Sequence, residues 1–365
     1  MLIKISLILF FLGMNFHLFG KVEVLKKNDS FDTQGACFLN KKPSIQFLSK
    51  KKGRVSILDE SLELYFSNLQ KKEIIAFTGE EPPQGDLSMN RDFAKQKFSS
   101  AVIEFSKDEQ KCISFVIDRV SNVLNENSLN LISSHPWKLI KVEDWLCGGF
   151  AHTRGDVIIL SQKYLDKLTT SWSENMTKDD EDQLVKRLGG LLLHEQFHCL
   201  QRTHKAIFDT LYTQSWGFVK VNVVPDSYIS TNQVSNPDAP IPEWAFMEGD
   251  QYYWVRTLIK EGVIIPKMGI DFVDVVFVLN KEENKFELEK DENGKLKTYR
   301  LSHFEEYVNS FPVNRGLDHP NEISAYMFSI YFTSLVNEVK PFKDVDEKSL
   351  INSNEFIKWI KSYLL

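Results

Sequence analysis

The 365-residue sequence lacks several features that define whole classes of protein. It has only 4 cysteines and no Cys-x-x-Cys pair, so a cysteine-ligated zinc site is not expected. Acidic residues outnumber basic ones, 50 to 44, and the net charge of −6 argues against nucleic acid as a partner. After residue 20, no stretch approaches the roughly 18 apolar residues that a membrane-spanning helix needs. We therefore expect no stable membrane insertion beyond the N-terminal segment.

Residues 1–20 have the pattern of a secretory signal peptide. A short positive start that includes Lys4 precedes an almost wholly apolar stretch at 5–20, which is too short for a confident membrane span. We expect a secreted or periplasmic protein; the alternative is a membrane anchor formed by an uncleaved N-terminal segment. In an oxidising compartment the four cysteines could form two disulfides in three pairings, with Cys199 buried.

The hydrophobic content of 42% is sufficient for a folded core. We expect residues 21–90 to form an irregular, partly β region and residues 91–365 to form the main domain. Strands are predicted at 137–142 and 156–160, and a polar loop flanked by glycines lies between them. A long helix is predicted after its N-cap, Thr177. Together with helical spacing at 90–124, a hairpin turn at Asn293-Gly294 and a helix at 356–365, the pattern indicates an α+β fold with a small mixed sheet and a helical C-terminal part.

The chemistry lies in the pentapeptide 194–198, which reads His-Glu-Gln-Phe-His. Two residues four positions apart on a helix differ by about 40° in direction and ~6 Å in rise, so His194 and His198 can bind one metal ion from the same face. Glu195 then lies beside them, where its carboxylate can take a proton from the water that attacks a substrate. Two imidazoles and one carboxylate suit Zn²⁺. Gly190 lies on the same stripe as His194 and is expected to leave room beside the site.

The sequence offers three candidates for the third ligand. His204 has the spacing of the extended metzincin motif, but that motif needs a glycine where this chain has Gln201, and a continued helix would carry His204 about 9 Å past His198. Glu248 lies in a Trp-x-x-x-Glu-Gly pattern that resembles the segment supplying the third ligand in many gluzincin peptidases; the simpler interpretation is a helix-capping or surface acid. Glu322 follows Pro320, which suits a helix start. A carboxylate in the first turn of a buried helix is explained by a metal, or more simply by the helix dipole.

The order of these motifs resembles a group of mostly bacterial HExxH proteins of the zincin superfamily, over roughly residues 140–335. It comprises the HEQFHCLQRTH segment, Trp216-Gly217-Phe218, the 235–240 loop and the HPNEISA segment that contains Glu322. The resemblance implies a zincin-like metallopeptidase fold of the gluzincin type and Zn²⁺ as cofactor. It favours Glu322 over Glu248 as third ligand. The chain departs from the thermolysin-like Glu-x-x-x-Asp helix at Tyr326, where an Asp would orient a histidine ligand.

Four further residues are candidates for substrate or oxyanion contacts. His152 and Arg154 could bind a substrate carboxylate or carbonyl, or could simply be exposed charges in a turn. Tyr212 and His319 could stabilise an oxyanion, or could be structural. We expect a metallopeptidase that acts on a peptide or protein substrate, with Glu195 as general base. The alternatives are a zinc-binding protein of the same fold without turnover, and a disulfide-stapled scaffold in which HExxH is accidental.

Overall fold

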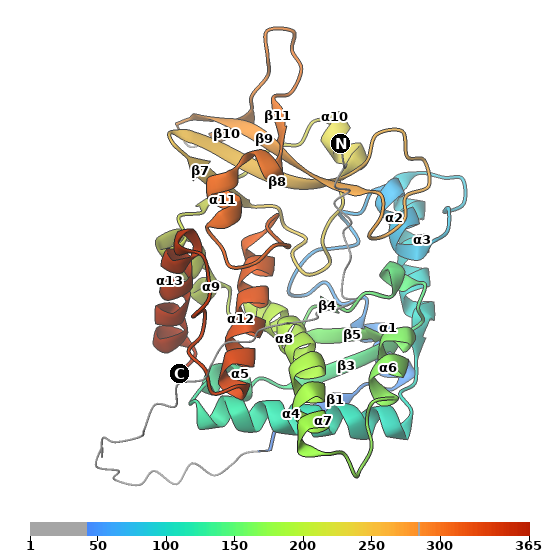
Figure 1. Ribbon diagram of the computed structural model, residues 1–365. Helices are drawn as coiled ribbons and strands as arrows, with labels where there is room; N and C mark the ends of the chain where they lie inside the picture. The colour runs from blue at the N-terminus through green and yellow to red at the C-terminus, as the bar shows by residue number, and fades with distance from the viewer. Residues whose placement is uncertain (1–41, 284) are drawn as a thin grey trace, which may run out of the picture.

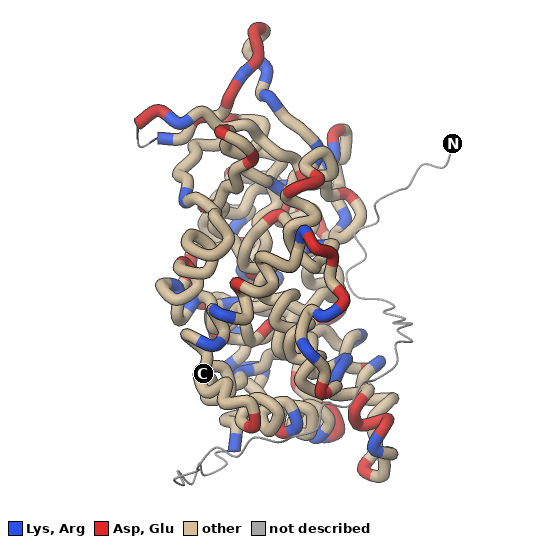
Figure 2. The backbone as a smooth tube through the Cα atoms, turned by 60° about the vertical axis from the view of Figure 1, so that its left-hand side comes forward, with Lys and Arg blue, Asp and Glu red and all other residues tan. Residues whose placement is uncertain are grey.

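The computed structural model describes residues 42–283 and 285–365, and it contains two β-sheets with helices packed beside and between them (Figure 1). The expected α+β class is confirmed. The predicted signal peptide at 1–20 and Cys37 lie outside the described residues. Acidic and basic residues are interspersed along the chain in Figure 2. No helix among the described residues is long and apolar enough to cross a bilayer.

The first sheet is small and mixed, as predicted. Its central strand β3 runs parallel to β1 and β5 and antiparallel to β2, and β4 lies antiparallel to β5 at the edge. The strands predicted at 137–142 and 156–160 are both confirmed, since they correspond to β3 and β5, which pair with each other. Both are almost wholly buried, which explains the apolar run of β5 and the apolar residues of β3, although β3 also contains Lys138 and Lys141. The strands of this sheet are β1 (Ile45–Phe47), β2 (Val102–Ile103), β3 (Trp137–Val142), β4 (His152–Arg154) and β5 (Val157–Ser161).

The described part of the N-terminal region, residues 42–90, is more helical than the sequence indicated. It contains only one strand, β1, followed by α1 (Lys50–Ser56), α2 (Lys71–Thr78) and the start of α3 (Leu87–Ala101). Each helix begins at a residue that caps its N-terminus, but its apolar run is too short for the sequence to predict a helix there. Gln70 and Glu73 form a capping box, and Asp86 caps α3 by accepting a hydrogen bond from the Met89 backbone. These helices pack on one face of the first sheet.

The second sheet is antiparallel and was not predicted beyond a single hairpin. Its order is β10-β9-β8-β7-β6, and β11 also pairs with β9. Asn293 and Gly294 do lie in a tight turn, in which the Gly294 backbone donates to the Asp291 carbonyl. The flanking segments pair with each other next to the turn, where Lys290 bridges Leu296 and the Lys297 backbone donates to the Glu289 carbonyl at 2.9 Å, so the predicted hairpin is confirmed. Farther from the turn, both flanking strands pair with β9. The strands are β6 (Val219–Lys220), β7 (Trp244–Glu248), β8 (Gln251–Ile259), β9 (Phe272–Glu282), β10 (Lys285–Leu288) and β11 (Thr298–Arg300).

A layer of long helices packs on the other face of the first sheet. Thr177 caps α7 as predicted, by accepting a hydrogen bond from the Asp180 backbone. A π-helical turn at 185–189 joins α7 to α8, and α12 packs along α8 (Figure 1). The C-terminal helix is α13, which begins earlier than predicted. The remaining helices are α4 (Lys107–Glu126), α5 (Asn130–Ser133), α6 (Gln162–Thr169), α7 (Lys178–Leu184), α8 (Gly190–Thr203), α9 (Lys205–Thr210), α10 (Ser227–Asn232), α11 (Glu305–Asn309), α12 (Pro320–Val336) and α13 (Glu347–Tyr363).

The cysteines do not form the two disulfides considered above. Cys112, Cys147 and Cys199 are buried and unpaired among the described residues. Cys199 is fully buried, as expected. Two disulfides would require all four cysteines, so the fold is stabilised by its apolar cores rather than by a disulfide framework.

The paired glycines before the histidine motif allow a direct test of this packing. A Cβ on Gly189 would lie 2.7 Å from Cγ2 of Val120, whereas a Cβ on Gly190 would meet nothing within 4 Å. We expect Gly189→Ala to lower the free energy of unfolding by about 1–3 kcal/mol through overpacking. Gly190→Ala should be neutral, or stabilising by up to ~1 kcal/mol, because alanine is the better helix former. Urea unfolding of both variants measures the contrast, and equal effects would contradict it.

Candidate metal centre

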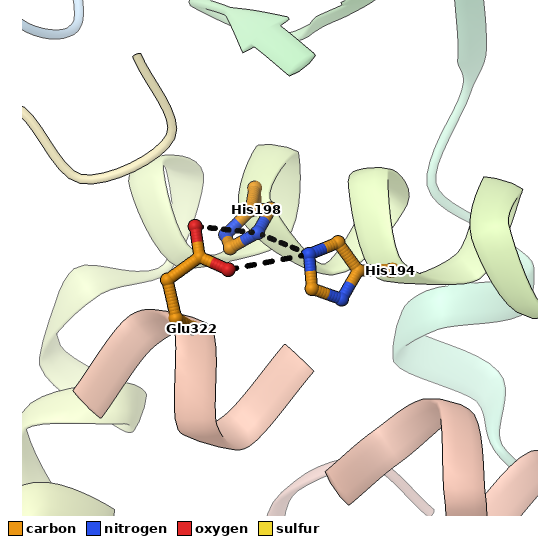
Figure 3. A group of neighbouring side chains, drawn as sticks. All are labelled: His194, His198 and Glu322. Atoms are coloured by element: carbon orange, nitrogen blue, oxygen red, sulfur yellow. Dashed lines mark hydrogen bonds and ion pairs between the residues drawn. The ribbon is translucent and has the colours of Figure 1, made fainter. Parts of the chain in front are cut away.

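Three buried side chains from α8 and α12 converge on one point (Figure 3). The Nε2 atoms of His194 and His198 lie 3.1 Å apart. The two carboxylate oxygens of Glu322 lie 3.4 Å from Nε2 of His194 and 3.7 Å from Nε2 of His198. The three side chains are at most 5% exposed. The structure therefore brings Glu322 to the histidine pair, as the motif order favoured.

The separations within this group fit a shared metal ion. Ligand atoms about 2.0–2.1 Å from a tetrahedral Zn²⁺ lie roughly 3.3 Å from one another. The two nitrogens lie 3.1 Å apart, and each nitrogen lies 3.4 or 3.7 Å from a different oxygen of Glu322, so the separations are of that size. Two imidazole nitrogens and a carboxylate oxygen are also a donor set that zinc accepts. The residues present can thus hold a divalent cation, although the geometry does not by itself select zinc.

Local sequence explains how α12 presents its carboxylate. Pro320 occupies the first turn of α12, and His319 is the N-cap, whose Nδ1 accepts a hydrogen bond from the Asn321 backbone at 3.1 Å. Glu322 follows within the first turn and is buried against α8. Ile323, Ala325 and Met327 hold the helix in the core. The carboxylate therefore projects from a rigid, capped helix end.

Gln201 fixes the orientation of His198. Its Nε2 donates to the Asn321 carbonyl at 2.9 Å and to the Ser324 hydroxyl at 2.8 Å, so its Oε1 faces Nδ1 of His198 at 2.8 Å. A carbonyl can only accept, which sets the amide orientation and requires Nδ1 of His198 to carry the proton. The lone pair of His198 is then on Nε2, which faces the group. Gln201 thereby joins a ligand on α8 to the helix that carries Glu322.

His194 is held differently. Its Nδ1 is buried and has no hydrogen-bond partner among the described residues. Its ring packs against that of Tyr326, with centroids 4.4 Å apart. Tyr326 occupies the position at which the thermolysin-like pattern has Asp, so ring packing replaces the expected hydrogen bond to a histidine ligand.

Burial and charge set the protonation states around the group. Burial lowers the pKa of His198, which keeps the imidazole in the neutral form that binds metals. Burial on its own would raise the pKa of Glu322, but His198, His194 and a 2.6 Å hydrogen bond from Nδ2 of Asn236 together lower it to about 2. Burial, together with the charges of Asp238 and Glu322, raises the pKa of Glu195. Oε2 of Glu195 has no partner among the residues described.

The two other third-ligand candidates lie elsewhere. Glu248 is the last residue of β7, and it pairs with Gln251 across a tight turn in which Gly249 has φ +62°. Its Glu-Gly pair is thus a hairpin turn signal. His204 ends α8, and its ring contacts His135 with centroids 6.3 Å apart. Neither residue belongs to the metal-binding group found among the described residues.

His152 and Arg154 point away from α8. Strand β4 places both on the same face as their partners in β5, Ile159 and Val157. That face packs against α1–α3, whereas Ile158 on the opposite face packs in the cluster that contains α8. The structure therefore does not support the prediction that these two residues contact a substrate at the metal centre.

Tyr212 and His319 are also occupied by other contacts. The Tyr212 hydroxyl lies 3.2 Å from Nε2 of Gln201 and 3.1 Å from the Ser324 hydroxyl. His319 contacts the Ile241 carbonyl through Nε2 at 3.1 Å, in addition to its capping bond. Both side chains thus make structural contacts around the group, and neither presents an unused donor to it.

Two residues that the sequence interpretation missed position the loop at 235–240. Asn236 hydrogen bonds to Glu322, and Asp238 accepts bonds at 2.6 Å from both the backbone and the hydroxyl of Thr153. Arg202, one turn after His198, donates to the Pro237 carbonyl at 2.7 Å. Only Gln201 and Arg202 could have been found from the sequence as supporting residues, because they follow His198 at helical spacing. Nothing in the sequence marked Asn236 as a partner of Glu322.

Comparisons with protein-family models, with curated proteins and with solved structures find no match to this chain.

Proposed function

We propose that this chain is a zinc-dependent metallopeptidase with a zincin-like fold of the gluzincin type. His194, His198 and Glu322 are the zinc ligands, and Glu195 is the general base. The single observation that carries the proposal is the convergence of these three ligand side chains from two helices on one point. The mixed sheet with an antiparallel edge strand beside the motif-bearing helix also supports it. The substrate is a peptide or protein, and the protein is secreted or periplasmic.

The residues divide the chemistry as follows. Bound zinc supplies a Lewis acid that polarises a carbonyl oxygen. Glu195 accepts the proton of the attacking water and then transfers it to the leaving amine. Gln201 keeps Nε2 of His198 available to the metal, and Asn236 holds one oxygen of Glu322. Each of these roles belongs to a side chain already fixed by packing, so the site is organised before a ligand arrives.

The experiment combines metal content with activity. The purified chain should contain about one zinc per molecule by mass spectrometry, and it should cleave a fluorogenic peptide library. A chelator should remove both the zinc and the activity, and added Zn²⁺ should restore both. If the chain does not bind zinc at any concentration tested, the proposal is refuted.

A second candidate is a zinc-binding protein of the same fold that catalyses nothing. The observation that favours it is the burial of the centre: His194 is 4% exposed, Glu195 2% and His198 0%. A substrate carbonyl must reach these atoms if the site is catalytic. One zinc per chain with no cleavage of any library peptide would establish this second function.

Replacing Gln201 should weaken zinc binding. Gln201→Leu removes the acceptor that fixes His198, and loss of such a supporting bond typically costs 10–100-fold in metal affinity. We expect a decrease of about that size in competition with a chelating dye. Gln196→Leu is the matched control, because Gln196 is equally buried on α8 but donates to the carbonyls of His135 and Pro136. Equal zinc affinities in the two variants would refute the role of Gln201.

A further inference from the structure

Arg154 is a fully buried cation whose donors have no acceptor. The side chain is 0% exposed, and none of its three guanidinium nitrogens has a hydrogen-bond partner in the part of the chain that the structure describes. It lies on the face of the first sheet opposite α8, beneath the irregular segment 59–70. A guanidinium carries five N–H donors, and burying them without an acceptor is costly. Such a group needs an acceptor, and the described residues do not supply one.

The carboxylates whose charges act on Arg154 or Tyr65 accept hydrogen bonds from other groups, and Glu73, for example, accepts from the backbones of Gln70 and Ser235. Glu63 accepts from Nε of Arg202 at 2.7 Å, and Asp238 accepts from Thr153. Oε1 of Glu60 accepts from the Tyr65 backbone at 2.7 Å. Glu60 and Glu63 influence Arg154 only through their charge. They offset part of that charge, but they leave the donors unused.

Tyr65 adds a second unused donor beside the first. The Arg154 guanidinium carbon lies 4.0 Å from the centroid of the Tyr65 ring, and the Tyr65 hydroxyl is buried without a hydrogen-bond partner among the described residues. Burial raises the pKa of Tyr65, so the hydroxyl keeps its proton and can donate. The ring of Phe66 lies 5.8 Å from the same guanidinium carbon. The donors of Arg154 and Tyr65 therefore lie side by side, with the guanidinium against the rings of Tyr65 and Phe66.

His152 is not part of this donor set. Its Nδ1 lies 3.0 Å from the Phe150 carbonyl, so Nδ1 carries the proton and the neutral ring presents a lone pair at Nε2. Burial lowers the pKa of His152, which keeps it neutral. A lone pair repels an anion.

We propose that Arg154 and Tyr65 bind a small monovalent inorganic anion of the chloride type between β4 and the 59–70 segment. The guanidinium supplies the charge, and the hydroxyl supplies a second donor. The burial of both donors favours a weakly hydrated ion. A divalent oxyanion is disfavoured because its second charge would face Glu60, Glu63 and Asp238. The bound ion would hold the 59–70 segment on the sheet.

Halide dependence of thermal stability tests the site. An anion that binds only the folded chain stabilises it by mass action. We expect the melting temperature to be a few degrees higher in sodium chloride than in sodium gluconate of equal ionic strength, and bromide to act at least as strongly as chloride. Arg154→Met should abolish the difference, and Tyr65→Phe should shift its midpoint to several-fold higher chloride. Identical melting temperatures in the two salts would overturn the proposal.

The matched control is Arg256→Met. Arg256 is also buried beside an aromatic ring, but its Nη2 donates to Gln233 at 3.3 Å and the charge of Glu73 acts on it. The chloride effect should survive this substitution. Loss of the effect in Arg256→Met, or its survival in both Arg154→Met and Tyr65→Phe, would overturn the assignment.

A bromide-soaked crystal of the unmodified chain covers the case in which Arg154→Met does not fold. We expect an anomalous peak within hydrogen-bond distance of the Arg154 guanidinium. Water at that position would show that there is no anion site. Bromide there without any chloride effect on the melting temperature in solution would show binding at crystal concentration only. Either result overturns the proposal.

Discussion

Glu195→Gln should abolish peptide hydrolysis while leaving zinc bound. Glu195 follows the ligand His194 directly on α8, and the metal-binding group does not include it. Removal of a general base typically costs 10²–10⁴-fold in rate, and we expect a loss of at least that size in kcat. The amide has nearly the same shape as the carboxyl group, and Oε2 of Glu195 makes no hydrogen bond among the described residues. The fold should therefore be unchanged.

Two measurements separate a catalytic role of Glu195 from a structural one. Zinc content should remain near one per chain, and the unfolding transition should remain near that of the unmodified protein. Glu248→Gln is the control, since that residue ends β7 away from the centre. Hydrolysis at the unmodified rate by the Glu195 variant would rule out the proposed base. Zinc loss in the same variant would instead point to a structural role.

Local signals in the sequence predicted the parts of the site that one helix can encode. The spacing of His194 and His198 needs only helical geometry. Thr177 marks the start of α7, which leads into α8 through a π-helical turn, and Pro320 marks the start of α12. The convergence of α8 and α12, in contrast, joins residues more than a hundred positions apart. Both acids follow plausible local patterns, and Glu322 was favoured over Glu248 by its place in the first turn of an apolar helix and by the resemblance to HExxH proteins.

The errors came from register and from long-range contacts. His152 and Arg154 were expected to contact a substrate, but the side-chain period of two puts them on the face of the sheet opposite α8. The sequence does not state which face α8 covers. The rest of the second sheet was missed for a similar reason, since β10 and β11, on either side of the predicted hairpin turn, also pair with β9. The sequence analysis used Gln201 only as the position where the metzincin motif has a glycine. In the structure, its amide hydrogen bonds to residues of both α8 and α12.

Glu322→Gln should remove zinc from the chain. The carboxylate is the only anionic member of the metal-binding group found among the described residues, and its oxygens lie 3.4 and 3.7 Å from the two histidine nitrogens. A neutral amide oxygen is a poor substitute in a zinc site of this type. Loss of a direct ligand should exceed the 10–100-fold effect of a supporting residue, so we expect at least a ~100-fold decrease in affinity.

The paired variant Glu248→Gln should retain zinc, because its side chain belongs to the β7–β8 hairpin. Mass spectrometry after dialysis against a chelator gives the contrast, with circular dichroism to verify folding. The substitution removes the negative charge of residue 322 but keeps one side-chain oxygen. Asn236 can still donate a hydrogen bond to that oxygen and keep the 235–240 loop in place, so zinc loss would report the loss of the charge. A folded Glu322→Gln chain that keeps its zinc would remove the carboxylate from the site. Zinc loss in Glu248→Gln alone would show that Glu248, in the β7–β8 hairpin, is the third ligand.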